Sequence, residues 1–339
     1  MTDRTRPDFD IARLAGYVET RLPELKGPMT VEPIGGGQSN PTFWLRFGTE
    51  TVVLRKQPAG ELLPSAHAVD REFKVQQALA ATDVPVPRML HFCEDRNVMG
   101  TLFYVMEALD GRVTQESLIP GVSAEERAAM YDSMNDVLAR LHKVDWQAVG
   151  LEGFGRPGSY FARQINRWTR QWRASKTREI PEIERLIDWL PANIPPGDDE
   201  TTLVHGDYRL GNLMFHPKEP RVIAVLDWEL STLGHPLADL GYNCILYHAT
   251  PEAYRIGVLG HDLAALGIPT QDEYVRRYCA RTGRKDGITA FHLAFSMFRF
   301  AVIFEGIAMR ARIGTAASAD AARVGALSEF FAKRACELI

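Results

Sequence analysis

Two carboxylates and one amide lie close together within residues 203–242. Asp207 follows a short apolar pair, Asn212 comes five residues later, and Asp227 ends the apolar run 222–226. Short apolar runs around a polar loop are typical of a hairpin, so we expect the three side chains to meet at one mouth. Phosphoryl transfer needs a carboxylate that takes a hydroxyl proton and oxygen ligands that hold Mg²⁺ on phosphates. These residues therefore predict a phosphoryl-transfer site.

The spacing in this stretch also matches a known motif. Protein kinases carry H-R-D-x-x-x-x-N and a later D-F-G. Here H-G-D at 205–207 precedes Asn212 at the same interval, and D-W-E at 227–229 replaces D-F-G. The chain resembles the aminoglycoside phosphotransferase and choline kinase branch of the protein-kinase-like fold, which has H-G-D and often D-x-E. It is most similar to the phosphotransferase-like proteins related to the N-terminal region of certain acyl-CoA dehydrogenases, over roughly residues 28–335.

The resemblance implies a role for each polar residue of the central loop. Asp207 would accept the proton of the substrate hydroxyl, and Asn212 and Asp227 would hold Mg²⁺. His205 would orient the loop rather than react. Arg209 would stabilise the charge of the transition state, although a side chain pointing to solvent is an equally good interpretation.

Three further residues lie near these motifs. We expect structural roles for two of them and leave two roles open for the third. Glu229 would either support a metal ligand or contact the metal itself. Asp239 resembles the aspartate that follows Gly-x-Pro in the family, and we expect it to cap a backbone turn. His142 ends a predicted helix in the pattern A-x-L-H-x-V-D, where it would donate to the backbone or to Asp145.

A glycine-rich loop lies between the predicted strands 30–34 and 42–47. No G-K-[ST] follows it and a strand rather than a helix comes next, so it is neither a Walker A loop nor a Rossmann fingerprint. Glycines let backbone N–H groups approach phosphates closely, whereas the alternative is an ordinary hairpin turn. With the downstream motifs in view, we expect phosphate binding by Gly36, Gly37, Ser39 and Asn40.

The strand predicted at 51–56 carries two neighbouring cations. Alternation along a strand places Arg55 on one face and Lys56 on the other. The kinase pattern V-A-I-K puts its cation where Arg55 falls, and Glu72 in the predicted helix 66–80 fits the partner glutamate. An arginine can still grip phosphate bidentately. Lys56 is the alternative candidate for the phosphate-binding cation. A third interpretation is that Arg55 is a surface residue on an edge strand and binds no phosphate.

The connector 103–111 completes the predicted nucleotide site. By resemblance, the backbone of Glu107 and Leu109 would hydrogen-bond the adenine edge, with Met106 behind the ring. The residues by themselves indicate only an apolar strand that ends in a polar turn. The resemblance thus implies ATP and Mg²⁺ as cofactors and a small-molecule alcohol as the substrate.

The order of the predicted elements indicates an α+β protein with a bilobal, protein-kinase-like fold. A small antiparallel sheet forms the N-terminal nucleotide-binding lobe, residues 1–107, together with an N-terminal helix. A larger, mostly helical lobe for catalysis and substrate binding follows at 108–339. Strands are predicted at 30–34, 42–47, 51–56, 89–93 and 102–106, and helices near 8–22, 66–80, 123–143, 158–174, 179–190, 237–248, 270–283, 288–312 and 318–337.

Composition narrows the partners and the compartment. The 339 residues carry 39 Lys and Arg against 43 Asp and Glu, a net charge of −4, with no basic tract. This balance argues against nucleic acid as a partner. The four scattered cysteines lack C-x-x-C spacing and indicate reduced thiols. No apolar h-region and no run of bilayer length is evident, so we expect a soluble cytoplasmic protein without a membrane partner.

Two arginine-bearing helices bear on the identity of the acceptor. Arg163 and Arg167 lie four residues apart and so share a helix face. Arg299 lies in an apolar helix and needs a partner, either Glu305 or a ligand anion. The alternative is that all three arginines pair with structural carboxylates. Cationic and aromatic side chains suit a hydroxy acid or a hydroxyacyl thioester better than an aminoglycoside, and the resemblance points the same way.

Other functions fit parts of this pattern. A metal-dependent phosphoester hydrolase also uses His and Asp, but His205 and Asp207 lack the further His/Asp clusters of a two-metal site. A catalytically silent nucleotide-binding module has no support, because every core acidic position is occupied. A protein kinase fits less well, because H-G-D and D-W-E are typical of the small-molecule branch. Aminoglycosides and other amino alcohols remain the alternative acceptors.

Overall fold

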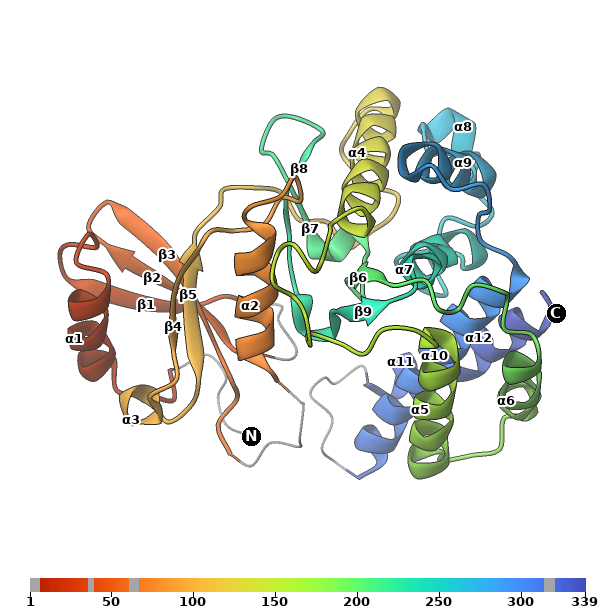
Figure 1. Cartoon of the computed structure of the whole chain (residues 1–339), viewed down its shortest axis with the longest axis horizontal. Coiled ribbons are helices and arrows are strands. Elements are labelled where there is room, and N and C mark those ends of the chain that lie inside the picture. Colours follow the sequence, from red (N-terminus) through yellow and green to blue (C-terminus); the bar gives the residue numbers. More distant parts are fainter. Residues whose placement is uncertain (1–6, 36–39, 61–66, 314–320) are drawn as a thin grey trace.

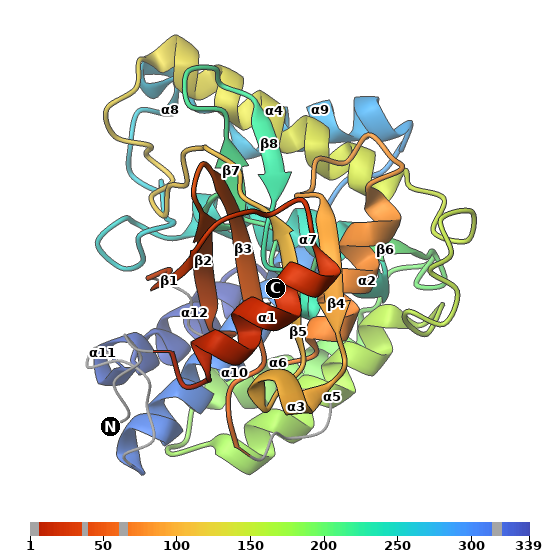
Figure 2. The same cartoon turned by 90° about the vertical axis from the view of Figure 1, so that its left-hand side faces the viewer.

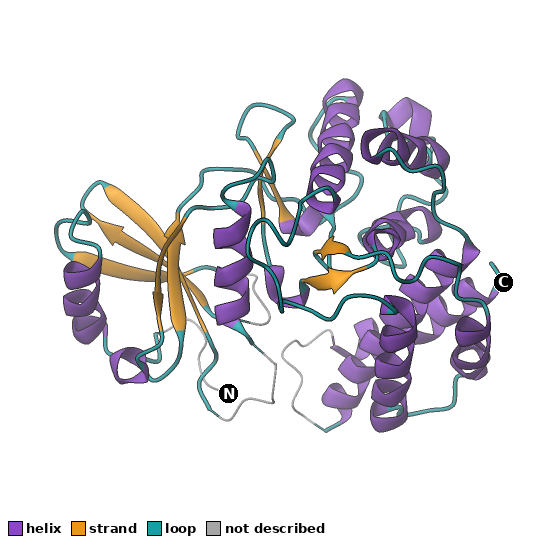
Figure 3. Ribbon diagram, viewed as in Figure 1, coloured by secondary structure: helices purple, strands orange, loops and turns teal. Residues whose placement is uncertain are grey.

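The computed structural model describes residues 7–35, 40–60, 67–313 and 321–339, which form two lobes (Figure 1). Strands gather in the N-terminal lobe and helices in the C-terminal lobe (Figure 3). The N-terminal lobe contains helix α1 (Ile11–Arg21), strands β1 (Met29–Pro33), β2 (Thr42–Phe47) and β3 (Glu50–Lys56), helix α2 (Val69–Leu79), strand β4 (Met89–Cys93), helix α3 (Arg96–Met99) and strand β5 (Phe103–Glu107).

The five strands form one antiparallel sheet in the order β1-β2-β3-β5-β4. Helix α1 covers its outer face, where Val18 joins Leu54 and Phe103 in a buried apolar cluster (Figure 2). Helix α2 lies on the other face, and its Phe73 stacks on Phe92 of β4. The period of two along each strand thus separates an α1 face from an α2 face that looks towards the C-terminal lobe.

This separation distinguishes the two cations of β3. Lys56 points to the α1 face, where its side chain is fully buried and Nζ lies 2.8 Å from Oδ1 of Asp8. Arg55 points to the α2 face, where Nε lies 2.8 Å from Oε2 of Glu72. Arg55 therefore faces the C-terminal lobe and Lys56 lies behind the sheet, while the choice between them as the phosphate contact stays a prediction.

The C-terminal lobe is built around α10 (Ala290–Arg312), which packs against α5, α7, α11 and α12. The helices of this lobe are α4 (Ala124–His142), α5 (Tyr160–Ser175), α6 (Pro181–Ala192), α7 (Pro236–Asn243), α8 (Leu263–Leu266), α9 (Gln271–Thr282), α10, α11 (Ala321–Gly325) and α12 (Leu327–Cys336). Four short strands, β6 (Thr202–Val204), β7 (Leu213–Phe215), β8 (Val222–Val225) and β9 (Thr232–Gly234), lie between α6 and α7, with 3₁₀ turns at Leu210–Asn212, Trp228–Leu230 and, after α7, Cys244–His248.

The predicted α+β, bilobal, kinase-like architecture is confirmed, and several details differ from expectation. The hairpin consists of β7 and β8 alone, whereas β6 pairs with β9, a strand that was not predicted. The helix predicted at 237–248 becomes 3₁₀ after Asn243, and the helix predicted at 318–337 is divided into α11 and α12 within its described part. Three- and four-residue elements such as β9, α3 and α8 are too short to show a hydrophobic period. The division between lobes at residue 107 stays a prediction, and β5 ends there.

Helix α10 contradicts the expectation that no apolar run has bilayer length. Among the described residues it is the one helix long and apolar enough to cross a membrane, judged by length and composition. Of its most apolar stretch, 83% is buried inside the molecule. Burial against neighbouring helices is typical of the core helix of a globular protein, and α10 has that role here.

Candidate active site

One face of α7 holds the loop at residues 205–208, which follows β6. Asp239 accepts hydrogen bonds from the backbone N–H of His205 (2.6 Å) and of Gly206 (2.9 Å). Asn243, one turn further along the helix, donates to the carbonyl oxygen of Tyr208 at 3.0 Å. Residues four apart share a helix face, so a single face satisfies three buried backbone groups of the loop. The prediction that Asp239 caps a backbone turn agrees with this geometry.

Helix α7 is positioned by its own first turn. The side chain of His235 accepts the N–H of Leu237 at 3.2 Å, and Pro236 occupies the first helical position. Proline is tolerated there because its missing N–H would have no partner within the helix. Gly234, just before this turn, allows the ring of Tyr160 to approach, since a Cβ atom would lie 2.6 Å from that ring.

Asp207 is surrounded by donors but remains accessible. The hydroxyl of Tyr242 donates to its Oδ1, and Nδ2 of Asn212 donates to its Oδ2 at 2.8 Å. Arg209 Nε lies 3.5 Å from Oδ1, while its Nη1 donates to Gln115 at 2.8 Å. The Asp207 side chain keeps 21% of its surface exposed. The geometry favours an Arg209 that faces the carboxylate over one that points to solvent.

The charge of Arg209 is reinforced by this setting. Burial alone would lower the pKa of Arg209, but the negative charge of Asp207 raises it above its usual value. The guanidinium therefore stays a cation beside the carboxylate. A fixed cation at this place is able to stabilise negative charge that develops next to Asp207.

Two buried histidines support the loop. His205 donates through Nε2 to the carbonyl oxygen of Leu226 at 2.9 Å, and its Nδ1 accepts the N–H of Asp207 at 3.1 Å. It thereby ties the loop to the end of β8, in agreement with an orienting role. His142 contacts the Tyr278 hydroxyl through Nδ1 at 2.6 Å. Its Nε2 lies 3.4 Å from Oδ2 of Asp239.

Neither of the two partners predicted for His142, the backbone or Asp145, appears among its hydrogen bonds in the described residues. Asp145 instead accepts the backbone N–H groups of Gln147 and Ala148 at 3.1 and 3.0 Å, because it caps the turn that follows α4.

Burial alone would raise the pKa of Asp239, but hydrogen bonds from His142 and His205 hold it below its ordinary value. Asp239 is thus an ionised anchor for the loop.

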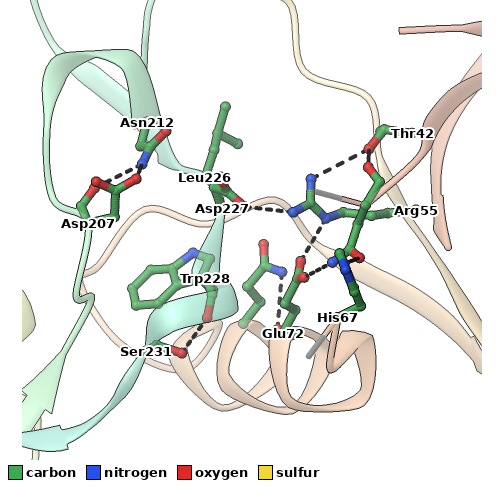
Figure 4. A network of polar contacts seen from close by, with 12 residues as sticks. Thr42, Arg55, His67, Glu72, Asp207, Asn212, Leu226, Asp227, Trp228 and Ser231 are labelled. Carbon is green, nitrogen blue, oxygen red and sulfur yellow. Dashed lines mark hydrogen bonds and ion pairs between the residues drawn. The ribbon is translucent and has the colours of Figure 1, made fainter. Parts of the chain in front are cut away.

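Asp227 lies across from this loop and connects the two lobes (Figure 4). Its Oδ1 accepts a hydrogen bond from Arg55 Nη2 at 2.6 Å, while Nε of the same guanidinium meets Glu72 at 2.8 Å. Asp227 has a left-handed backbone, with φ of 64°, and a side chain that is 36% exposed. Aspartate tolerates this conformation better than most residues, and it aims the carboxylate out of the β8 end.

The charge of Arg55 is fixed by its neighbours. Burial would lower its pKa, but Glu72, Tyr104, Asp227 and Glu229 together raise it above the usual value. The sequence left the role of Glu229 open, and the negative charge of Glu229 contributes to the raised pKa of Arg55. The predicted Arg55 and Glu72 are brought together as an ion pair, and their role towards a nucleotide stays a prediction.

Glu72 is held by two further donors. Asn40 Nδ2 donates to Oε1 at 2.5 Å, and the Tyr104 hydroxyl donates to Oε2 at 3.0 Å. Asn40 is itself buried, and its Oδ1 meets His67 Nδ1 at 2.9 Å. Its side chain therefore supports Glu72, and its predicted contact with phosphate stays a prediction. The predicted Gly36, Gly37 and Ser39 lie outside the described residues.

The predicted adenine contacts lie where β5 leaves the sheet. Met106 pairs with Val53, and so it shares the α2 face of the sheet with Arg55. The N–H of Glu107 donates to the carbonyl oxygen of Arg88 at 2.9 Å. Leu109 follows in a segment without regular structure. The assignment of these three residues to adenine stays a prediction.

Arg299 reaches from α10 to the loop at residues 205–208. Its Nη2 donates to the carbonyl oxygen of Gly206, and its guanidinium carbon lies 5.5 Å from the ring centre of Trp168 and 5.2 Å from that of Tyr242. Its buried Nε has no hydrogen-bond partner within the described residues. Glu305 is not its partner, because that carboxylate is taken by Thr177 and Arg178. The alternative of a ligand anion remains open.

Of the two arginines predicted on α5, Arg167 lies close to Arg299 and Arg163 does not. The Arg167 guanidinium lies 5.4 Å from the ring centre of Trp168, and its pKa is lowered by partial burial and by the positive charge of Arg299. Arg163 instead donates to the carbonyl oxygen of Arg156. Sharing a helix face with Arg167 therefore did not bring Arg163 into the same cluster.

The donor set near Asp227 fits a magnesium ion. Asn212 uses its amide nitrogen on Asp207, which leaves its amide oxygen as an acceptor. One carboxylate and one amide oxygen are typical of a protein site that shares Mg²⁺ with phosphates. Within the described ranges, no three His, Cys, Asp or Glu side chains gather into a group that could hold a metal ion by themselves.

Comparisons with known proteins agree with the geometry. The model of the phosphotransferase enzyme family matches residues 30–278. Acyl-CoA dehydrogenase family member 10 of Mus musculus is 48% identical over 312 residues, which are 91% of this chain but 29% of that relative. The chain thus spans less than a third of that relative's length.

Two solved structures extend the comparison. A Ralstonia eutropha protein assigned as an aminoglycoside phosphotransferase is 49% identical, with a TM-score of 0.88 over 97% of this chain and 98% of its own. A spectinomycin phosphotransferase in complex with ADP and spectinomycin is 10% identical, with a TM-score of 0.63 over 97% and 98% of the two chains. At that identity the second likeness concerns the fold alone.

Gly206 generates the first testable prediction. Its φ is +81°, and a Cβ atom would lie 2.6 Å from the carbonyl oxygen of Leu230. Gly206→Ala should therefore displace the loop, with roughly a hundredfold loss of phosphotransferase turnover and a lower melting temperature. Gly153→Ala is the control, because Gly153 has φ of +75° with no atom within 4 Å. It should cost only about 1–2 kcal/mol of stability, the penalty of a Cβ atom in the left-handed conformation. Equal effects in the two variants would contradict the close packing described for Gly206.

Proposed function

The chain belongs to the phosphotransferase enzyme family, and on this basis we propose that it transfers the γ-phosphoryl group of ATP to a hydroxyl of a small molecule. The observation that carries the proposal is the placement of Asp207. Its carboxylate is held by Asn212 and accompanied by Arg209, opposite the ion pair of Arg55 with Asp227. A base, a cation and oxygen ligands thus converge where the two lobes meet.

Each of these residues has a distinct task in the proposed reaction. Asp207 accepts the proton of the acceptor hydroxyl, and Arg209 stabilises the charge that develops on the transferred group. Asn212 and Asp227 hold Mg²⁺, which neutralises phosphate charge when bound. Arg55, oriented by Glu72, contacts the nucleotide phosphates.

The remaining nucleotide contacts follow the family pattern. Met106, Glu107 and Leu109 receive the adenine, and the phosphate contacts predicted for Gly36, Gly37, Ser39 and Asn40 stay part of the proposal. The spectinomycin phosphotransferase with ADP has the same fold, which supports a nucleotide in this position. The four free cysteines suit the reducing environment of the cytoplasm, where we place the enzyme.

We infer that the acceptor carries an anionic or acyl group, as in a hydroxy acid or a hydroxyacyl thioester. Arg299 has no carboxylate partner among the described residues, lies next to Arg167, and contacts the loop that carries Asp207. Two neighbouring arginines that lack a carboxylate partner in the described part of the chain disfavour a polycationic aminoglycoside through charge repulsion. The likeness to acyl-CoA dehydrogenase family proteins supports the acyl alternative.

The alternatives rest on weaker observations. An aminoglycoside or amino-alcohol acceptor is suggested by the assignment of the Ralstonia eutropha relative. A two-metal phosphoester hydrolase would need further His or Asp ligands around Asp207. The side chains that contact the Asp207 carboxylate in the described ranges are instead those of Asn212, Arg209 and Tyr242.

Replacing the proposed base tests the reaction directly. Asp207→Asn should lower turnover on the order of 10²- to 10⁴-fold, because it removes general-base catalysis. Calorimetric affinity for Mg-ATP should stay near the wild-type value, since Asp207 acts on the acceptor. Asp70→Asn, an exposed carboxylate on α2, is the matched control. Wild-type turnover in Asp207→Asn would rule out this carboxylate as the base.

Asp227 is tested through nucleotide affinity. Asp227→Asn is preferable to alanine, because asparagine tolerates the left-handed backbone at φ of 64°. The variant should bind Mg-ATP at least tenfold more weakly by calorimetry, since it loses the charged metal ligand. Binding of ATP in the presence of EDTA should change much less. An unchanged affinity for Mg-ATP would show that another group holds the metal.

The acceptor class is tested with a panel. ATP consumption is measured with 3-hydroxybutyrate, its coenzyme A thioester, choline, ethanolamine and kanamycin. We expect turnover with the first two. Arg167→Ala should raise their KM roughly 5- to 50-fold with little change in kcat, as for loss of a charge-assisted hydrogen bond. Arg170→Ala, exposed on the same helix, should behave as wild type. Efficient use of kanamycin alone would contradict the anionic acceptor.

A further inference from the structure

We propose that the hydroxyl of Tyr242 is a positioning group for Asp207, which fixes the carboxylate for the acceptor and keeps it apart from Arg209. This inference rests on the proposed function, because it assigns Asp207 the role of base. Tyr242 was not singled out in the sequence, and it enters through geometry alone. Its hydroxyl donates directly to Oδ1 of Asp207.

The ring of Tyr242 is held on two sides. It is 6% exposed and stacks on Phe300, with ring centres 5.1 Å apart and planes 9° apart. The guanidinium carbon of Arg299 lies 5.2 Å from its centre. A side chain fixed in this way loses little further entropy when its hydroxyl binds a carboxylate. The contact is therefore built in advance rather than formed by chance.

The hydroxyl competes with a cation for the same oxygen atom. Arg209 Nε lies 3.5 Å from Oδ1, which is too far for a good hydrogen bond. If the Tyr242 hydroxyl were absent, the guanidinium would be free to close from this loose ion pair into a hydrogen-bonded one. That pair would occupy the base and withdraw the cation from the transferred group. The tyrosine thus keeps two oppositely charged neighbours in separate places.

Burial keeps Tyr242 a donor. Desolvation, followed by the negative charge of Asp207, raises the pKa of Tyr242 well above its usual value, against the opposing charges of Arg299 and Arg209. The phenol is therefore protonated throughout the range in which enzymes are assayed. Its donated hydrogen bond does not depend on any titration step.

A purely structural role does not account for this contact. Asp239 and Asn243 already bind the backbone of the loop, on the same face of α7. Tyr242 alone on this face reaches the side chain of Asp207. Loss of its hydroxyl should therefore change where the carboxylate points, while the loop and the helix stay in place.

The test is Tyr242→Phe, which keeps the stacked ring and removes one oxygen atom. Turnover of Mg-ATP is measured with the best acceptor of the panel and with water alone. We expect kcat to fall roughly 10- to 100-fold, which is less than the full general-base contribution of about 10²- to 10⁴-fold because the carboxylate itself is kept, with the KM for Mg-ATP and the melting temperature unchanged. Tyr247→Phe is the control, because that buried hydroxyl donates to the carbonyl oxygen of Pro269, away from the loop. It should behave as wild type.

Combination with Asp207→Asn separates this inference from the proposed function. If Tyr242 acts through Asp207, adding Tyr242→Phe to Asp207→Asn should cause no further loss of turnover. A kcat of Tyr242→Phe within twofold of wild type, or a full additional loss in the double variant, would overturn the positioning role alone. An active Asp207→Asn enzyme would overturn the proposed base, and this inference with it.

Discussion

The rest of the site depends on the hydrogen bonds between the buried carboxylate of Asp239 and the loop at residues 205–208. This carboxylate satisfies the backbone N–H groups of His205 and Gly206, which could not otherwise be buried without a large cost in free energy. Because α7 also carries Tyr242 and Asn243 on this face, the same helix fixes the direction of the carboxylate at 207 and of the carbonyl oxygen at 208. Helix α10 adds Arg299 against the carbonyl oxygen of Gly206. The site is therefore precise because two helices of the larger lobe hold one short loop.

A second constraint connects the lobes through a single guanidinium. Arg55 meets Glu72 through Nε and Asp227 through Nη2, so one side chain spans the sheet, α2 and the end of β8. A lysine has a single nitrogen atom at the end of a flexible chain and cannot hold this fork geometry. The arginine thus orients the carboxylate that we assign to the metal while it faces the proposed phosphate site. Because Arg55 both orients Asp227 and faces the proposed phosphate site, an arginine can replace the lysine that the kinase pattern leads one to expect.

Sequence reasoning was strongest where motifs are local and weakest where contacts are distant. The interval from Asp207 to Asn212 and the alternation at Arg55 are fixed by short-range geometry, and both were predictable. The pairing of β6 with β9 was not, because three-residue strands carry no period. The burial of Asn40 against Glu72, and the capture of Glu305 by Thr177 and Arg178, depend on residues far away in the chain. The one signal for Tyr242 was its place three residues after Asp239 on a predicted helix, which becomes meaningful only once Asp239 is known to face the loop.

The central claim is that Asp207 directs a phosphoryl group onto an alcohol rather than onto water. Phosphorus NMR of the reaction mixture tests it most directly, because it identifies the product without a coupled assay. With Mg-ATP and a 3-hydroxyacyl thioester, the account predicts a new phosphate monoester resonance that grows in step with ADP. Inorganic phosphate as the only product with ADP, for every acceptor supplied, would contradict the account and identify the enzyme as a hydrolase.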